Sequence, residues 1–195
     1  MSEQTAAAWE LHLFLASLGI QYAVIGGMAV QRWGEPRFTQ DVDVTVVAPL
    51  NNPTAFIEQV VERFQPRITD AIVFARRNRI ILVRANNGCP MDISLGLPGY
   101  EAEVMRRTVN HELEPGKPIR LCSAEDLIIH KAVAGRPQDE RDIEGIIYRQ
   151  RDALDVRYIR TWLCDFAELL AKPEIQERFE RPWQRISPSR SRTRE

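Results

Sequence analysis

The chain has 195 residues, enough for one domain with a sizeable hydrophobic core, alone or with an appendage. Its 26 basic and 27 acidic residues nearly cancel and exclude a strong overall attraction to nucleic acid, although basic clusters occur at residues 76–79, 106–107 and beyond 177. No apolar run reaches the roughly 18 to 20 residues that span a membrane and no signal peptide is recognisable, so we expect a cytoplasmic protein without membrane contact.

Strands and helices alternate in the first part of the chain. In order, we expect a helix over residues 5–18, a strand over 21–25, a helix over 28–33, a strand over 41–47 and a helix over 54–64. In the second strand Val42, Val44 and Val46 face one side, which leaves Asp41 and Asp43 on the other. The pattern predicts a half-buried strand with acids at one end of its open face.

The middle of the chain predicts further strands. Two short apolar runs, residues 71–75 and 80–84, are separated by an arginine-rich segment and predict a hairpin or a bent strand pair. After them we expect a strand over 89–95, a helix over 99–108, strands over 109–113 and 118–121, and helices over 123–133, from 137 through 147 or beyond, 155–170 and 173–180.

This order of elements predicts an α/β (α+β) fold with a helical C-terminal part, because strands interleaved with helices are followed by helices only. We expect a core over residues 1–122, a helical part packed on it over 123–182 and a disordered basic tail over 183–195. A flexible basic tail neutralises the phosphates of a nucleic acid without fixed geometry. Plain solubilising disorder explains the same composition, so both interpretations stay open.

The segment over residues 25–47 carries the candidate chemistry. Gly26 and Gly27 follow the first strand and let the backbone approach a ligand closely, since neither has a Cβ atom. The helix expected from Met28 would point its unpaired N–H groups at the same place, and such a terminus binds phosphate. Asp41 and Asp43 project from one side of their strand roughly 6.5–7 Å apart, as suits a hard cation. Each pair alone also fits a turn or a solvated edge, but together they are typical of nucleotide-handling proteins.

The spacing in this segment resembles a known signature. Gly26-Gly27, thirteen intervening residues and Asp41-x-Asp43 are similar to the signature of the DNA-polymerase-β-like nucleotidyltransferase superfamily. The approach through Arg37 and Thr39 resembles the R-x-T-x-D-x-D form of its small bacterial and archaeal members, which include the abortive-infection-type toxin nucleotidyltransferases. The resemblance implies a polymerase-β-type nucleotidyltransferase fold, a mixed sheet flanked by helices.

Asp92 matches the third carboxylate that the resemblance implies. In the superfamily this acid stands on a later strand beside the Asp-x-Asp strand, and Asp92 lies in the apolar run over residues 91–95. Three carboxylates in one cleft repel each other unless a cation lies between them. We therefore expect Asp41, Asp43 and Asp92 to bind metal, with two Mg²⁺ ions, and Asp92 to accept the proton of the acceptor hydroxyl.

A second group of residues resembles the helical block downstream of the catalytic strands in these enzymes. The matching residues are Asp126-Leu127, Lys131, Arg136, Asp139 and Asp142. Lys131 suits a triphosphate, and Arg136 suits either a bidentate phosphate contact or a pair with one of the aspartates. The alternative for Lys131 is a solvated surface lysine, which its otherwise apolar helix argues against. Asp139 and Asp142 share a helix face as supporting residues, and helix capping or structural salt bridges explain them equally well.

The resemblance implies a Mg²⁺-dependent nucleotidyltransferase that moves NMP from an NTP, such as ATP, to an acceptor hydroxyl with release of pyrophosphate. The residues expected to contact the NTP phosphates are Gly26, Gly27, Met28, Arg37, Thr39, Lys131 and Arg136. Toxin-type relatives imply an RNA or tRNA acceptor and a cognate antitoxin as partner. A small-molecule acceptor of the aminoglycoside type and a catalytically inactive nucleotide- or partner-binding module on the same fold stay open.

Overall fold

The structure, a computed structural model, describes residues 2–47, 52–96 and 99–187, and the chain divides into two units. Unit 1 comprises Met1–Met28 and Phe38–Ser123, and unit 2 comprises Ala29–Arg37 and Ala124–Glu195. The boundary after Ser123 lies one residue beyond the predicted end of the core. The sequence did not indicate that residues 29–37 belong to unit 2.

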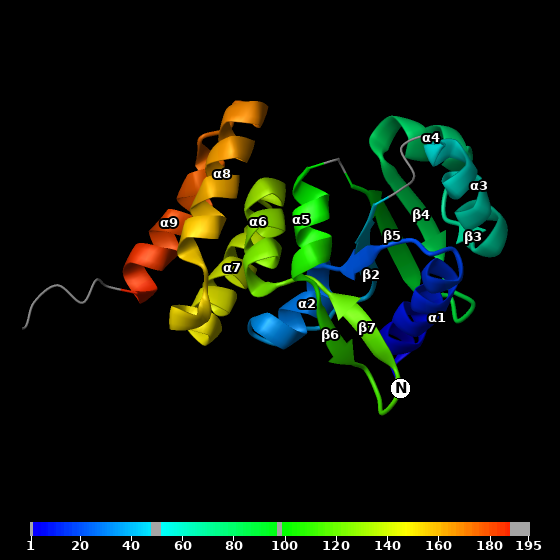
Figure 1. The fold of residues 1–195 in the computed structure, drawn as a ribbon, viewed down its shortest axis with the longest axis horizontal. Helices are drawn as coiled ribbons and strands as arrows, with labels where there is room; N and C mark the ends of the chain where they lie inside the picture. The colour runs from blue at the N-terminus through cyan, green and yellow to red at the C-terminus, as the bar shows by residue number, and fades with distance from the viewer. Residues whose placement is uncertain (1, 48–51, 97–98, 188–195) are drawn as a thin grey trace, which may run out of the picture. The chain divides into compact units, whose positions relative to one another are not determined.

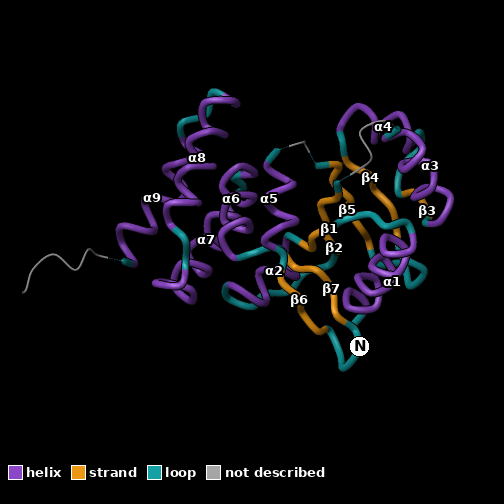
Figure 2. The backbone as a smooth tube through the Cα atoms, viewed as in Figure 1, coloured by secondary structure: helices purple, strands orange, loops and turns teal. Residues whose placement is uncertain are grey.

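Unit 1 is built on a mixed sheet, traced in Figure 2. Its described strands are β1 (Tyr22–Val24), β2 (Val42–Val46), β3 (Gln65–Pro66), β4 (Ile80–Arg84), β5 (Pro90–Leu95), β6 (Val109–Glu112) and β7 (Pro118–Leu121). They lie in the order β3-β4-β5-β2-β1-β7-β6, in which β2 with β5 and β1 with β7 are parallel and the other pairs are antiparallel. The predicted mixed sheet is therefore confirmed.

Helices pack against this sheet in unit 1 (Figure 1). They are α1 (Glu3–Ser17), α3 (Pro53–Arg63), α4 (Ala71–Asn78) and α5 (Tyr100–Arg107), whereas α2 (Gly26–Trp33) begins in unit 1 and ends in unit 2. Polar side chains fix two of the helix starts: Ser2 Oγ accepts the Thr5 N–H at 3.1 Å, and Asn52 Oδ1 accepts the Ala55 N–H at 3.0 Å. Pro53 at the start of α3 has no N–H to leave unsatisfied.

The prediction of a strand over residues 71–75 is wrong, because this segment forms α4. Its buried residues are Ala71 and Ala75, four apart and therefore on one helix face, while Val73 between them is 66% exposed. The left-handed residue Arg79, with φ of +56°, ends α4 and turns the chain into β4. The antiparallel partners of β4 are β3 and β5. Tertiary packing on α3 and β4 outweighs the local β-propensity of the run.

Unit 2 is helical in the part that the structure describes, as predicted for its C-terminal segment. It contains α6 (Ala124–Ala134), α7 (Pro137–Gln150), the short 3₁₀-helix η1 (Arg151–Ala153), α8 (Val156–Leu170) and α9 (Glu174–Ile186). Its core residues include Leu127, Ile128, Ile143, Ile146, Ile147, Ile159, Leu163 and Phe179. Along the described ranges, no helix combines the length and hydrophobicity that crossing a membrane requires.

Close contacts with α7 explain why residues 29–37 belong to unit 2. A Cβ atom on Gly145 would lie 3.0 Å from the backbone nitrogen of Glu35, so the glycine permits this close approach. Gln150 Nε2 donates a hydrogen bond to the Trp33 carbonyl at 2.8 Å, and Arg149 Nη1 donates one to the Gly34 carbonyl at 2.5 Å. These bonds join segments that are more than 100 residues apart in the sequence.

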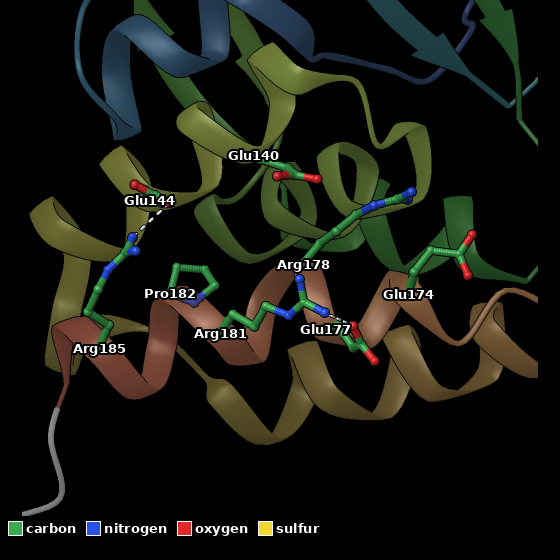
Figure 3. A pocket seen from close by; sticks show the side chains of 8 residues that line it. All are labelled: Glu140, Glu144, Glu174, Glu177, Arg178, Arg181, Pro182 and Arg185. Carbon is green, nitrogen blue, oxygen red and sulfur yellow. Dashed lines mark hydrogen bonds and ion pairs between the residues drawn. The ribbon is translucent and has the colours of Figure 1, made fainter.

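The segment expected to begin a disordered tail at residue 183 instead continues α9 to Ile186. Trp183 stacks on Phe179 with ring centroids 5.7 Å apart, and Arg185 Nη2 lies 2.7 Å from Glu144 Oε1 on α7. Figure 3 shows Arg185 and Glu144 among the glutamates and arginines of α7 and α9 that line a pocket. The volume of this pocket is about 280 Å³. The rest of the predicted tail, residues 188–195, lies outside the described residues.

Candidate active site

The three candidate catalytic acids stand on two adjacent strands of unit 1. Strand β2 pairs in parallel with β5, and the register places Asp43 directly opposite Asp92, while Asp41 immediately precedes β2. The neighbours of Asp43 and Asp92 along the strands are buried valines, Met91 and Ile93, so both acids lie on the open face. The prediction that the Asp92 strand lies beside the Asp-x-Asp strand is confirmed.

Polar side chains contact Asp41 and Asp92. Thr39 Oγ1 donates a hydrogen bond to Asp41 Oδ1 at 3.0 Å, and Arg67 Nη1 donates one to Asp92 Oδ1 as an ion pair. Among the described residues no group of three His, Cys, Asp or Glu side chains is arranged to hold a metal ion. Since carboxylates repel each other, contacts with a hydroxyl and a guanidinium stabilise this arrangement of the acids.

Sequence reasoning missed Arg67. It follows the two-residue strand β3, belongs to no motif and precedes Asp92 by 25 residues. Only the pairing of β3 with β4 and of β4 with β5 brings it to the acid. A lone arginine after a proline carries no sequence signal that would have identified this contact.

The glycine pair lies directly against the acidic residues. The Ile25 N–H donates a hydrogen bond to the Asp43 carbonyl at 2.9 Å, which anchors the chain just before the glycines. Gly26 has φ of +62°, and a Cβ atom there would lie 1.9 Å from Asp43 Oδ2. A Cβ atom on Gly27 would lie 2.3 Å from Thr39 Oγ1. Helix α2 starts at Gly26 rather than at the predicted Met28, so the glycines form its first turn, where backbone N–H groups lack helical partners.

Three side chains predicted to bind phosphate, those of Arg37, Lys131 and Arg136, form ion pairs with two aspartates in unit 2. We call these three residues together with Asp139 and Asp142 the charged network. Lys131 is only 4% exposed, and its Nζ lies 2.8 Å from Asp139 Oδ1 and 2.8 Å from Asp142 Oδ2. Arg37 binds Asp142 through Nε at 2.8 Å and Nη2 at 2.9 Å, and Arg136 Nε binds Asp139 Oδ2 at 2.7 Å. The alternative that Lys131 is a surface lysine is therefore wrong.

The two aspartates of this network are held in the charged state. Burial by itself raises the pKa of Asp139, but hydrogen bonds from Arg136 and Lys131 outweigh it and leave the pKa below its ordinary value. Burial likewise raises the pKa of Asp142, and hydrogen bonds from Arg37, Lys131 and Gln138 reverse the shift. Asp139 also accepts the backbone N–H of Arg136 at 3.1 Å, which caps the start of α7. Both structural roles considered for the aspartates, capping and ion pairing, are present.

A comparison with models of protein families identifies the family of this chain. The model of the family described as nucleotidyl transferase AbiEii toxin, Type IV TA system, matches residues 11–190. The chain belongs to this family. Its fold and family make it a nucleotidyltransferase, which confirms the superfamily resemblance seen in the sequence. No curated protein sequence matches it.

Solved structures share the fold of this AbiEii-family chain. An antigenic nucleotidyltransferase-like protein from Paracoccidioides brasiliensis is 18% identical and aligns with a TM-score of 0.51 over 91% of this chain and 92% of its own. The antibiotic-resistance factor ANT(2'')-Ia, in its solution structure, is 17% identical with a TM-score of 0.55, over 90% of this chain and 98% of its own. At these identities the likeness shows the nucleotidyltransferase fold.

The glycine turn of this AbiEii-family protein offers a test with a matched control. Gly26→Ala introduces the strain of a left-handed alanine, about 1–2 kcal/mol, and a clash with Asp43. Gly19→Ala introduces the same strain at φ of +64° but has no atom within 4 Å of the new Cβ. We expect both variants to lose stability in urea unfolding and only Gly26→Ala to lose nucleotidyl transfer as well. Equal activity of the two variants would contradict the close packing of the turn on Asp43.

The half-buried histidine of α6, His130, predicts a pH dependence of stability. Burial, and then the positive charge of Lys131, lowers the pKa of His130 to about 4 from its ordinary value of 6.5. The unfolded chain therefore takes up a proton more readily, so the free energy of unfolding should fall by about 3 kcal/mol between pH 6.5 and pH 4. The pKa values of Asp139 and Asp142 lie below their ordinary value, so these carboxylates take up protons only below this pH range. Their protonation removes ion pairs and lowers the free energy of unfolding further.

Urea unfolding across this range measures the effect. His130→Gln should flatten the dependence between pH 4 and 6.5, whereas His111→Gln on β6 should leave most of it. An unchanged slope in the His130 variant would contradict the role given to burial.

Proposed function

We propose that this AbiEii-family chain transfers NMP from an NTP to a hydroxyl group of an RNA acceptor, with Mg²⁺ as cofactor and release of pyrophosphate. The observation that carries the proposal is the register of β2 and β5, which sets Asp43 opposite Asp92 beside the turn at Gly26. This places two carboxylates next to backbone N–H groups suited to phosphate.

The residues at this place fit Mg²⁺ in kind. Carboxylate oxygens are its preferred ligands, and Asp41, Asp43 and Asp92 are all partly exposed to solvent. Gly26 has no side chain, so the Asp43 carboxylate packs directly against it, and a Cβ atom there would lie only 1.9 Å from Asp43 Oδ2. Two Mg²⁺ ions bound by these acids would neutralise charge on the phosphates and lower the pKa of the acceptor hydroxyl.

The chain's own residues then have distinct tasks in the proposed reaction. The N–H groups at the start of α2 hold the β- and γ-phosphates, and Thr39 orients Asp41 through its hydrogen bond. Asp92 takes the proton of the acceptor hydroxyl. The acceptor oxygen forms a bond to the α-phosphorus while the bond from that phosphorus to the bridging oxygen breaks, and pyrophosphate leaves.

The charged network is assigned a supporting task. Lys131 and Arg37 are engaged by buried carboxylates, and a phosphate would have to compete with these ion pairs. The Arg136 side chain is 72% exposed, and its guanidinium pairs with Asp139. Because of this exposure, Arg136 is the member of the network best able to contact a phosphate as well.

Two observations support RNA as the acceptor. The family is described as a toxin of a toxin–antitoxin system, which also makes an antitoxin a proposed partner. At the end of α4, Arg76 and Arg77 are exposed, and within the described part of the chain no acid pairs with either. Exposed arginines without acidic partners suit the phosphates of RNA.

The test is to incubate the protein with Mg²⁺, each α-labelled NTP in turn and total cell extract, and to identify the labelled product. We expect label on RNA in the wild type and none with Asp43→Asn. Label on a small molecule would show that the acceptor is of the aminoglycoside type and not RNA. No label on any component, with intact NTP binding, would favour the inactive binding module.

A further inference from the structure

Arg67 reaches Asp92 across a row of residues that share the open face of the sheet. Its backbone N–H donates a hydrogen bond to the Leu82 carbonyl at 3.0 Å, Leu82 pairs in register with Asp92, and Asp92 pairs with Asp43. Adjacent strands lie about 4.8 Å apart, so the arginine side chain must span about two strand spacings. The long aliphatic stem of arginine allows this reach over the face that Leu82 shares.

The Arg67 guanidinium reduces the electrostatic repulsion between two carboxylates on neighbouring strands. Asp43 and Asp92 are directly opposite on adjacent strands, and like charges in that position are destabilising. Arg67 pairs with Asp92 and brings one positive charge to this row of the sheet. It therefore supplies locally some of the charge that a divalent cation would supply.

The exposure of this ion pair distinguishes it from the charged network. The side chains of Arg67 and Asp92 are 26% and 24% exposed, whereas those of Lys131 and Asp139 are 5% and 1% exposed. A fully buried pair is costly to open because it leaves an uncompensated charge, whereas a partly exposed pair can be replaced by water or another partner at a lower cost. The Arg67–Asp92 pair is thus exchangeable, while the Lys131 pairs are structural.

We propose that Arg67 is a positioning residue that holds Asp92 in the metal-free protein and yields this carboxylate when a divalent cation binds. The inference rests on the proposed function, because it takes Asp92 as a metal ligand. Arg67 keeps Asp92 ordered and reduces its repulsion with Asp43 until the cation arrives. Because Arg67 competes with the cation for the Asp92 carboxylate, it also weakens binding of the cation.

The test measures Mn²⁺ binding to the full chain without nucleotide, by the electron paramagnetic resonance signal of free Mn²⁺. Arg67→Met should bind Mn²⁺ about two- to fivefold more tightly than the wild type, the range expected when a partly exposed ion pair no longer competes. Its metal-free melting temperature should fall, and the rise in melting temperature on adding Mn²⁺ should exceed that of the wild type. Arg67→Gln, also neutral, should show the same gain and serves if the methionine variant does not fold.

Three further variants separate the possible outcomes. Arg63→Met removes a similar arginine of unit 1, paired with Glu10, and should leave Mn²⁺ affinity unchanged. Asp92→Asn should weaken Mn²⁺ binding, and adding Arg67→Met to it should bring no gain. If Asp92→Asn weakens binding but the Arg67 variants bind like the wild type or more weakly, the inference alone is overturned. If Asp92→Asn binds Mn²⁺ like the wild type, the proposed metal role of Asp92 fails together with the inference.

Discussion

We expect Asp43→Asn to lower the rate of nucleotidyl transfer by about a thousandfold or more while the fold stays intact. Asparagine matches aspartate in shape but removes the charge that opposes Asp92, and loss of charge stabilisation worth several kcal/mol corresponds to such a factor. Transfer of label from an α-labelled NTP at saturating Mg²⁺ measures the rate. Circular dichroism checks the fold.

Stability of the same variant gives an independent readout. Removing one of two opposed negative charges should raise the melting temperature of the metal-free protein. Asp165→Asn, on the exposed surface of α8, is the matched control and should change neither activity nor melting temperature. Turnover near the wild-type rate in Asp43→Asn would show that the assignment of Asp43 is wrong.

The second large effect is expected at Lys131. Lys131→Met should lower the free energy of unfolding by about 3 kcal/mol, because breaking a buried ion pair leaves uncompensated charge. Asp139 and Asp142 lose the cation that binds both of them, although Arg136 and Arg37 still pair with one each. Urea unfolding at neutral pH measures the loss.

Two comparisons make this prediction specific. Lys172→Met, which follows α8 at an exposed position, should stay within about 0.5 kcal/mol of the wild type. Adding Asp142→Asn to Lys131→Met should recover part of the stability, since one of the uncompensated charges is then gone. If Lys131→Met is as stable as the wild type but binds NTP less tightly, the phosphate contact first expected for Lys131 would be the better explanation.

Local patterns explain what could be predicted at the acidic strand. The alternation of Val42, Val44 and Val46 with polar residues has the period of a strand and sets the faces before any partner is known. The glycines were recognisable only together with the aspartates, because a glycine pair alone also fits an ordinary turn. The adjacency of Asp92 to Asp43 came from the family resemblance, and the register of β2 and β5 confirms it.

Segments with a mixed local signal were predicted less well. Residues 71–75 are apolar enough for a strand, but their burial at a spacing of four appears only once α3 and β4 are in place. Residues 29–37 follow the glycine turn in the sequence, yet their hydrogen bonds go to Arg149 and Gln150 of α7. No periodicity in a short segment shows which distant helix it will contact.

The sequence by itself determined the fold class, the strand faces and the residue types of the candidate site, because these depend on side-chain period and on chemistry carried within a few residues. The tertiary structure alone decided which charges meet. Lys131 pairs with an acid eight residues away, Arg67 with one 25 away and Arg37 with one 105 away. An ion pair depends on distance through space and on the water that burial removes, and neither quantity is a property of a local stretch of sequence.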